Sequence, residues 1–495
     1  MTDSRSQINI DELDFSKLTE LILPAPVQHG DSVTAFLTLA NGVQDVEVQV
    51  KTLSPVGIEF VAENSIAGLT AGDSISLALS FGGLATDLSG IVVEITAVSE
   101  QDSRITVRLN QSNEKRLDDQ ERRTATRWHC DEKFYPTAIA SNPGRYNDYI
   151  YFSIRDLSRS GARAVTSLRN KFILRGMRLE CLVSFPMVTQ ISMEFEVKNI
   201  TVVSERGKDL LSVGLEFVTA TEIDLSAVAQ YLIQFGDAST LEELRSEQLY
   251  PKSIAKAVDY SFVRTDDELQ EVIELRYTAY KQEGKIAEGK KVLADAYDAR
   301  SRIVIGKYKG KIVASARIFI PEFGDQIEQE EYLQLPPECS RREDLVEVVR
   351  VCTHPEFRRS DLLVSLLKFI AITCIQARRY TVIGCATKEL LSLYTKVGFR
   401  DTGIEYEHPE LNNTKHNLII ADVRRSVLGR DVGPIVWNVL WKDTAKYLIE
   451  NELLEHDPMS HVRVMIYKML SPLSILARRR SNKPRRKIPS PTGNK

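Results

Sequence analysis

The sequence predicts a multidomain protein with two all-β barrels in tandem, an α/β domain after them and helices at the C-terminal end. Residues 15 to 112 alternate short apolar runs with Gly, Pro and Ser, which is typical of a β-barrel. The same pattern returns at a constant offset of 104 residues. Between Leu345 and Phe399 the pattern changes to strand, helix, strand and helix, which indicates an α/β domain.

Composition sets the broad class of the protein. The chain has 495 residues, enough for several domains, and its net charge of -4 names no partner. Its six cysteines include no C-x-x-C pair, which favours a reducing compartment and argues against structural zinc. The first residues are polar, and no apolar run approaches the length of a membrane span. We therefore expect a cytoplasmic protein without a bound metal.

The constant offset indicates that the two barrels share one design. The segments 15–112 and 118–236 match at a Leu-Ser-x-x-Gly motif and at a later glycine. The matching pairs are Ser54 with Ser158, Gly57 with Gly161, and Gly72 with Gly176. Self-similarity at a fixed period is the signature of repeated structural units. We therefore expect these two segments to form similar barrels.

The second segment carries charged residues that the first one lacks. It opens with E-R-R-T-A-T-R and continues to R-D-L-S-R-S-G, which place in one barrel Arg122, Arg123, Arg127, Asp156, Ser158 and Gly161. These motifs resemble the R-x-x-x-R and D-x-S-x-x-G motifs of the PilZ domain, a bacterial receptor for cyclic di-GMP. The resemblance implies that residues 118–236 bind cyclic di-GMP. The first barrel has Thr52 in place of Asp156, and we expect it to be a degenerate PilZ-like barrel that binds no nucleotide.

The residue types in these motifs suit a dinucleotide. Guanidinium groups can grip both guanine and phosphate oxygens, and an aspartate can accept hydrogen bonds from guanine N–H groups. Ser158 can donate to a phosphate, and we expect Gly161 to adopt a backbone conformation barred to other residues. The alternative interpretations are a solvated basic linker for the first motif and an ordinary Asp/Ser/Gly turn for the second.

The segment from Leu345 to Phe399 supports a second resemblance. L-V-E-V-V-R-V-C predicts a buried strand that His354-Pro355 ends, and the apolar spacing after it predicts a helix. T-V-I-G-C-A-T predicts another strand, and K-E-L-L-S-L-Y-T-K-V-G-F predicts a short helix that ends at Gly398. The start of a helix beside a strand favours an anion. The turn H-P-E-F-R-R and the later L-Y-T-K-V-G-F resemble the acyl-CoA N-acyltransferase (GNAT) superfamily.

In that superfamily this turn holds the phosphates of the acyl donor. The resemblance implies Arg358, Arg359 and Ser360 as the residues that bind phosphopantetheine. Asp361 and Leu363 stand where the superfamily has glycines that let the backbone wrap a pyrophosphate. Phosphopantetheine on acyl carrier protein has one phosphodiester and needs less room, and pairs of arginines around the predicted helix suit an acidic partner. We therefore expect acyl carrier protein as partner and donor, with acyl-CoA as the alternative donor.

Flanking segments extend the resemblance to acyl-homoserine-lactone synthases and long-chain N-acyl amino acid synthases. These families carry an arginine on the first helix, a D-x-x-D, an R-(I/L)-x-x-P and an E-x-x-R. The matching residues, with the tyrosine of the later motif, are Arg276, Asp295, Asp298, Arg317, Glu347, Arg350 and Tyr394. The resemblance implies that residues 259–426 form an N-acyltransferase with a small amine as acceptor. The tryptophan of the lactone synthases is missing, which argues against S-adenosylmethionine as acceptor.

Amide formation from a thioester needs a neutral amine, a route for its proton and donors for the oxyanion. Glu347 is the predicted proton route, through water, and its alternative role is an ion pair with Arg350. Residues three apart on a regular strand point to opposite faces, so joint action of these two requires a β-bulge. The resemblance implies Tyr394 as general acid for the leaving thiol. Its alternative role is packing under the last strand.

The acidic pair has two interpretations. Asp295 and Asp298 are predicted to lie one helical turn apart and to orient Arg276 and Arg317, or to bind the acceptor amine. The alternative is a solvated helix face.

Three further segments complete the chain. Residues 237–258 predict a linker with one short helix, and 427–477 predict C-terminal amphipathic helices. The apolar stripe of the first of these helices consists of Trp437, Leu440, Trp441, Ala445 and Leu448. Residues 478–495 form a basic tail without acidic residues, which we expect to be disordered and to attract an anionic surface such as the inner membrane. A solubilising role is the alternative.

The sequence thus predicts a bacterial N-acyltransferase regulated by cyclic di-GMP. It would transfer a long-chain acyl group from acyl carrier protein to the amine of an amino acid or a similar small molecule. The alternative is a non-catalytic adaptor that responds to cyclic di-GMP and whose acyltransferase-like domain binds a lipid or a protein.

Overall fold

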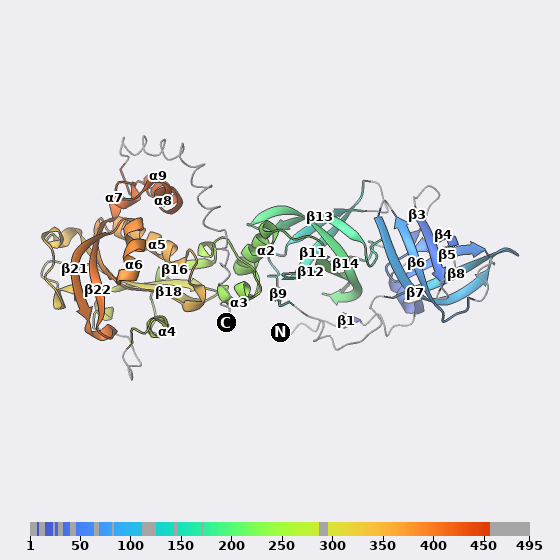
Figure 1. Cartoon of the computed structure of the whole chain (residues 1–495), viewed down its shortest axis with the longest axis horizontal. Helices are drawn as coiled ribbons and strands as arrows, with labels where there is room; N and C mark the ends of the chain where they lie inside the picture. The colour runs from blue at the N-terminus through green and yellow to red at the C-terminus, as the bar shows by residue number, and fades with distance from the viewer. Residues whose placement is uncertain are drawn as a thin grey trace, which may run out of the picture. The chain divides into compact units, whose positions relative to one another are not determined.

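The structure is a computed structural model, and it divides into two compact units, Met1–Lys252 and Ser253–Lys495 (Figure 1). It describes residues 7–8, 15–22, 25–27, 33–39, 46–63, 69–81, 84–110, 125–142, 147–170, 172–286 and 296–455. Five predictions fall outside these residues: Arg122, Arg123, Asp295, the second C-terminal helix and the basic tail 478–495.

The first unit begins with a closed six-stranded barrel. Its strands are β3 (Val33–Leu39), β4 (Val46–Leu53), β5 (Gly57–Glu63), β6 (Ser74–Phe81), β7 (Leu84–Ala97) and β8 (Asp102–Leu109). They are ordered β4-β3-β6-β7-β8-β5, and β5 pairs with β4 to close the barrel. Before it lie β1 (Gln7–Ile8), α1 (Phe15–Leu21) and β2 (Ala25–Pro26). The prediction of strands from residue 15 onward was wrong at Phe15–Leu21, which is helical.

The second barrel repeats this topology. Its strands are β10 (Thr137–Ser141), β11 (Tyr149–Ser158), β12 (Gly161–Ser167), β13 (Arg178–Phe185), β14 (Thr189–Glu205) and β15 (Lys208–Phe217), with β9 (Arg127–His129) paired to β11. Their order is β11-β10-β13-β14-β15-β12, and β12 pairs with β11. Strand β12 starts 104 residues after β5, and β13 starts 104 residues after β6. The predicted repeat is therefore confirmed as a repeated fold.

Helices follow the second barrel and pack on it. Helix α2 (Glu222–Phe235) contacts β13 and β14, and the hydroxyl of Tyr231 donates to the carbonyl of Phe134 at 3.0 Å. Helix α3 (Leu241–Ser246) lies in the predicted linker. Trp128 Nε1 in β9 donates to Glu243 at 2.7 Å, so this part of the linker is folded onto the barrel.

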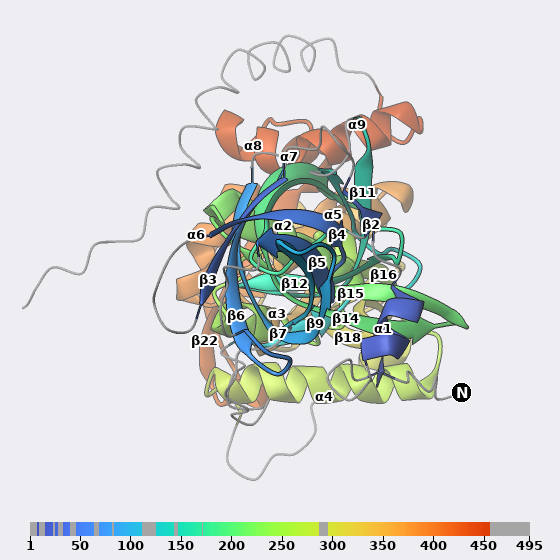
Figure 2. The same ribbon diagram turned by 90° about the vertical axis from the view of Figure 1, so that its right-hand side faces the viewer.

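The second unit is built on a seven-stranded sheet. The strands are β16 (Val258–Phe262), β17 (Arg302–Tyr308), β18 (Lys311–Phe319), β19 (Leu345–Thr353), β20 (Thr381–Ala386), β21 (Arg400–His408) and β22 (Thr414–Asp422). Their order is β16-β17-β18-β19-β20-β22-β21; β19 and β20 are parallel and the other neighbours antiparallel. Helix α4 (Asp266–Gln282) lies on one side of the sheet and α5 (Leu362–Gln376) on the other (Figure 2).

The predicted order of strand, helix, strand and helix is confirmed by β19, α5, β20 and α6 (Lys388–Val397). Helix α6 ends at Gly398, which has φ 114°, a conformation that favours glycine. The order is that of an α/β domain in which a parallel strand pair is joined by a helix.

Three short helices, α7 (Val423–Val427), α8 (Pro434–Leu440) and α9 (Lys442–Glu450), close the described part of this unit. The predicted apolar stripe is buried. Trp437 Nε1 donates to the carbonyl of Val427 at 2.7 Å, and Trp441 Nε1 to that of Val397 at 3.2 Å. The predicted single helix is divided at Trp441. Among the described helices, none is long and apolar enough to cross a membrane.

Candidate functional site

The second unit contains a cavity where two parallel strands separate. Strands β19 and β20 pair from Leu345, opposite Thr381, to Glu347, opposite Ile383. Beyond that point their next residues, Val348 to Val351 and Gly384 to Thr387, line the cavity. Its empty volume is about 740 Å³, including the open mouth. The divergence leaves backbone groups of β19 without a sheet partner on the cavity side, which makes them available to a ligand.

A β-bulge in β19 shapes this cavity. On β18, Ser315 and Arg317 are two residues apart, but they lie opposite Cys352 and Val349, which are three apart. The extra residue falls at Arg350, whose φ of 55° is in the left-handed region. Such a conformation costs a non-glycine residue roughly 1 to 3 kcal/mol and is found at functional sites. The bulge expected from the E-x-x-R spacing is therefore confirmed.

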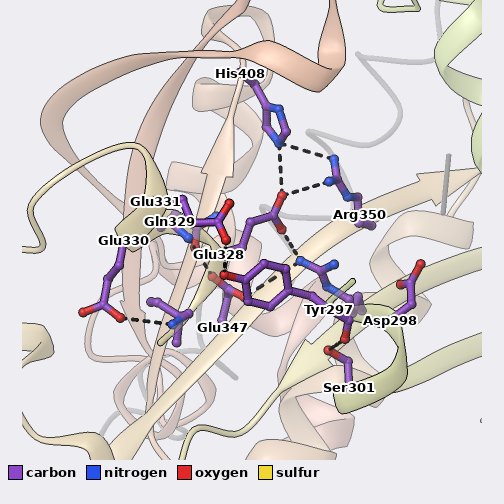
Figure 3. Close-up of polar contacts among 12 residues, drawn as sticks. Tyr297, Asp298, Ser301, Glu328, Gln329, Glu330, Glu331, Glu347, Arg350 and His408 are labelled. Atoms are coloured by element: carbon purple, nitrogen blue, oxygen red, sulfur yellow. Dashed lines mark hydrogen bonds and ion pairs between the residues drawn. The ribbon is translucent and has the colours of Figure 1, made fainter. Parts of the chain in front are cut away.

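Two arginines and a histidine meet at one carboxylate, Glu328, and Figure 3 shows it with Arg350 and His408. Glu328 begins the short helix η4 (Glu328–Glu331). It accepts hydrogen bonds from Nη2 of Arg350 at 2.8 Å and from Arg317, and Nε2 of His408 lies 3.2 Å away. Burial alone would raise the pKa of Glu328, but the hydrogen bond from His408 and the charges of Arg350 and Arg317 lower it to about 2. Glu328 is therefore ionised at neutral pH.

Glu347 lies next to the cluster of Glu328, Arg317, Arg350 and His408, and its pKa is raised where that of Glu328 is lowered. Its side chain is 0% exposed, and Oε1 accepts a hydrogen bond from the backbone N–H of Gln329 at 3.1 Å. In the part of the chain that the structure describes, Oε2 has no hydrogen-bond partner, and it lies 4.0 Å from Nη2 of Arg317. Burial, and then the charge of Glu328, raise the pKa of Glu347 to about 7. It can therefore gain or lose a proton near neutral pH.

The predicted residues fall into two groups. Arg317, Glu347 and Arg350 meet around Glu328. Arg276 and Asp298 form a separate buried pair, in which Nη1 of Arg276 donates to both carboxylate oxygens at 2.9 and 2.8 Å. Asp298 therefore orients Arg276, as predicted, but the partner of Arg317 is Glu328. Asp298 lies in the short helix η3 (Asp298–Arg300) and is buried, so it is not part of a solvated helix face.

Tyr394 lies in the wall of the cavity, on α6. Its ring packs edge-on against Phe399 with centroids 5.4 Å apart, and burial raises the pKa of its hydroxyl. Tyr394 thus packs in the wall of the cavity, and its role as general acid for the leaving thiol stays a prediction.

Two residues of the cluster, Glu328 and His408, were not found in the sequence. Glu328 stands in an acidic run, I-E-Q-E-E, between two strands, where a solvated loop is the ordinary interpretation. His408 precedes a proline at the end of a strand, the same pattern as His354-Pro355. The two are 80 positions apart, and no local pattern joins them.

The turn predicted to bind phosphopantetheine makes several contacts of its own. Arg358 donates to the carbonyl of Ala279 at 3.1 Å and forms an ion pair with Glu283, the residue after α4, at 3.0 Å. Ser360 donates to the carbonyl of Phe357 at 2.6 Å, and Arg359 has φ 58°. The role of these three residues in binding the donor stays a prediction.

Asp361, at one of the superfamily's glycine positions, has a structural partner. Its carboxylate accepts a hydrogen bond from the backbone N–H of Ile254 at 2.9 Å and from the hydroxyl of Ser253 at 2.5 Å. These bonds hold the chain before β16 against the start of α5. A carboxylate at the start of a helix also disfavours a second anion there, because like charges repel.

In the second barrel, Asp156 gathers two arginines. It is 4% exposed, and it accepts hydrogen bonds from Nε of Arg163 at 2.5 Å and Nη1 of Arg127 at 3.3 Å. The predicted residues Arg127 and Asp156 thus meet, because β9 pairs with β11. Arg163, directly across from Asp156 on β12, was not predicted.

Ser158 and Gly161 form a tight turn in the second barrel, and Ser54 and Gly57 form the matching turn in the first. Gly161 N–H donates to the Ser158 hydroxyl at 3.1 Å, and Gly57 N–H donates to Ser54 at 2.9 Å. Gly161 was predicted to need an unusual φ, and that was wrong. A Cβ there would lie 2.1 Å from the carbonyl oxygen of Leu215, so the glycine is needed for close strand approach.

Among the described residues, no group of three or more His, Cys, Asp or Glu side chains is placed to hold a metal ion.

Comparison with known proteins finds a family match within the second unit. Residues 271–421 match the family model described as N-acyl amino acid synthase FeeM. The described sheet and helices of this segment form an α/β domain, preceded in the chain by the two six-stranded barrels. The similarity to this family therefore covers residues 271–421, less than a third of the chain. No curated protein matches the chain.

Solved structures with similar parts each cover between 34% and 40% of the chain. FeeM, an N-acyl amino acid synthase from uncultured soil microbes, is 14% identical over 34% of this chain and 93% of its own, with a TM-score of 0.28. A GNAT family acetyltransferase from Elizabethkingia anophelis with acetyl-CoA bound is 14% identical over 34% and 98%, with a TM-score of 0.23. The K. pneumonia MrkH complex with c-di-GMP is 14% identical over 40% and 85%, with a TM-score of 0.20.

Proposed function

We propose that this protein is an N-acyltransferase that joins an acyl group from a thioester to the amine of an amino acid or a similar small molecule. The observation that carries the proposal is the cavity between the diverging strands β19 and β20, with ionisable side chains in and beside it. The match of residues 271–421 to an N-acyl amino acid synthase family supports the same reaction.

The cavity offers what amide formation requires. The backbone N–H groups of β19 beyond Glu347 have lost their pairing with β20, and donors of this kind can stabilise the oxyanion formed from the thioester carbonyl. The amine's proton needs an acceptor, and the candidates are Glu347, beside the cavity, whose pKa burial raises to about 7, and His408, in the cavity wall. Tyr394, in the cavity wall, is placed to protonate the leaving thiolate.

We further propose acyl carrier protein as the donor. Asp361 occupies a glycine position of the superfamily's phosphate-binding turn, and its carboxylate is already bonded to residues 253 and 254. The turn therefore has less room and less positive potential for the pyrophosphate of CoA than a glycine-rich turn. Arg358, Arg359 and Ser360 would then hold the single phosphodiester of a carrier-bound phosphopantetheine.

We also propose that the second barrel binds cyclic di-GMP and regulates the transferase. The support is the cluster of Arg127, Asp156 and Arg163, in which the buried carboxylate orients two guanidinium groups that are partly exposed. Oriented guanidinium groups can form paired hydrogen bonds with phosphate or guanine. The arginines of the preceding motif, Arg122 and Arg123, would complete the site.

The test is direct. Purified full-length protein is incubated with long-chain acyl carrier protein thioester and a pool of amino acids, with and without cyclic di-GMP. We expect release of the carrier thiol and an N-acyl product of matching mass, at a rate that changes with the nucleotide. A non-catalytic adaptor would release no thiol above the no-enzyme blank, and that result would contradict the proposed function.

A further inference from the structure

His408 stands out among the side chains of the cavity. It is the last residue of β21, is 3% exposed and lines the cavity together with Glu328. Glu347, in contrast, is 0% exposed and is not among the residues that line the cavity. A group that takes a proton from a bound amine must come within hydrogen-bond reach of it. The position of His408 meets this requirement more directly than that of Glu347.

Glu328 fixes the tautomer of this histidine. Nε2 of His408 lies 3.2 Å from Oε1 of Glu328, an ionised carboxylate that can only accept. Nη1 of Arg350 lies 3.3 Å from the same nitrogen, so the opposite tautomer is also geometrically open. That tautomer would set the lone pair of Nε2 against the carboxylate, and it would bury an Nδ1–H without an acceptor. The proton therefore lies on Nε2, between the ring and Glu328.

This leaves Nδ1 as the basic nitrogen. Nδ1 is buried and has no hydrogen-bond partner among the residues that the structure describes. Buried polar atoms are nearly always paired, so an unpaired one at a cavity indicates a partner that binds there. A carboxylate that holds one ring nitrogen orients the imidazole and stabilises its protonated form, which makes the other nitrogen a better base.

The groups around the ring are compatible with this role. Its aromatic neighbours are Tyr332, Tyr406 and His416, with centroid distances of 5.1, 6.3 and 5.8 Å. Burial lowers the pKa of His416 to about 4, so this neighbour is neutral at the pH of the reaction. Among the residues that the structure describes, the charged groups in contact with His408 are Glu328 from η4 and Arg350 from β19, and Lys285 lines the same cavity.

We propose that His408 is the general base of the acyl transfer, with Glu328 as its positioning residue. This inference rests on the proposed function. The amine nitrogen forms a bond to the thioester carbonyl carbon while the C=O π electrons move to oxygen, and Nδ1 of His408 takes the proton from nitrogen. The carbonyl re-forms, the C–S bond breaks with its electron pair on sulfur, and a proton returns to the thiolate. The products are an amide and a free thiol. His408 returns to its starting state when the proton it took from nitrogen has passed to sulfur.

Two variants separate His408 from Glu347. His408→Gln keeps an N–H donor toward Glu328 but has no basic nitrogen. Glu347→Gln removes the other candidate base. We measure kcat/KM against pH for both variants and wild type, with the exposed His129→Gln of the second barrel as control.

We expect kcat/KM of His408→Gln to fall about 100-fold to 10,000-fold, the range for loss of a general base. The acidic limb of the pH profile, in which kcat/KM decreases toward low pH, should disappear in this variant. Glu347→Gln should keep the acidic limb, and His129→Gln should match wild type. An acidic limb that persists in His408→Gln, or that disappears in Glu347→Gln, would overturn the assignment. Thermal unfolding shows whether His408→Gln is folded. If it is not folded, Glu347→Gln decides alone: loss of its acidic limb overturns the assignment, and retention of that limb supports it. A wild-type protein that releases no thiol with any amine refutes the proposed function and this assignment together, an outcome distinct from an active enzyme with the wrong base.

Discussion

The pH dependence of stability gives a quantitative test of the buried carboxyl Glu347. Its pKa is about 7 in the folded protein, against 4.5 for an exposed glutamate. Between these values the folded state binds more protons than the unfolded state, so the free energy of unfolding falls as pH rises from 4.5 through 7. The stabilisation is complete below 4.5. The difference between the two pKa values corresponds to a loss of about 3 kcal/mol at high pH.

The variant Glu347→Gln cannot ionise and should not show this loss. We expect it to exceed wild type in stability by up to about 3 kcal/mol at pH 8.5 and to approach wild type near pH 4.5. Glu328, whose pKa is lowered to about 2, loses its own stabilising effect only as pH falls below 4.5. That effect is present in both proteins and cancels in the difference.

The assay is urea unfolding at several pH values, read by hydrogen exchange of peptides from β18 and β19 so that the signal comes from this unit. The exposed Glu343→Gln, two positions before β19, is the matched control and should follow wild type at every pH. A difference between Glu347→Gln and wild type that stays constant from pH 4.5 to 8.5 would refute the argument, because it would show that Glu347 does not change its charge.

Three further predictions concern ligands and packing. Asp156→Ala should weaken cyclic di-GMP binding by about 1.5 to 3 kcal/mol, as for a charged hydrogen bond, while Thr52→Ala leaves it unchanged in calorimetry; equal affinities in both variants would exclude the site. Turnover should be faster with acyl carrier protein than with the same acyl-CoA and should fall with added salt, which screens the arginine pairs; equal, salt-independent rates would exclude a carrier-protein surface. Asp361→Ala should lower the free energy of unfolding of the second unit by about 1 to 3 kcal/mol in urea titrations, because it leaves the N–H of Ile254 without its acceptor; an unchanged value would mean that this tether is not stabilising.

Local patterns were enough to predict the elements from β19 to α6. The apolar run and the proline after His354 define β19. Helix α6 ends at Gly398, which has a left-handed conformation, as the sequence predicts. The bulge at Arg350 was expected from the family resemblance, because two residues at odd spacing cannot share one face of a regular strand and joint action of Glu347 and Arg350 requires a bulge. The barrel repeat was visible because its offset is constant.

The centre of the site could not be predicted in the same way. Glu328 joins Arg317, Arg350 and His408, which come from three different strands, and the contacts depend on how the sheet is assembled. A glutamate in an acidic loop has no local feature that marks it as buried. Arg163 escaped notice for the same reason, because its pairing with Asp156 is a cross-strand contact.

The hairpin of β4 and β5 in the first barrel matches the hairpin of β11 and β12 in the second, so the two can be compared within one protein. Ser54 and Gly57 make the same hydrogen bonds as Ser158 and Gly161, so the two hairpins have the same geometry. Where the second hairpin pairs an aspartate with Arg163, the first has Thr52 hydrogen-bonded to Glu59 at 3.1 Å, so the charge carried by β12 is reversed on β5. The two hairpins thus share a scaffold and differ in their electrostatics. Anion binding by the second barrel can therefore be compared with that of the first barrel in the same protein, where the matching hairpin carries Glu59 in place of Arg163.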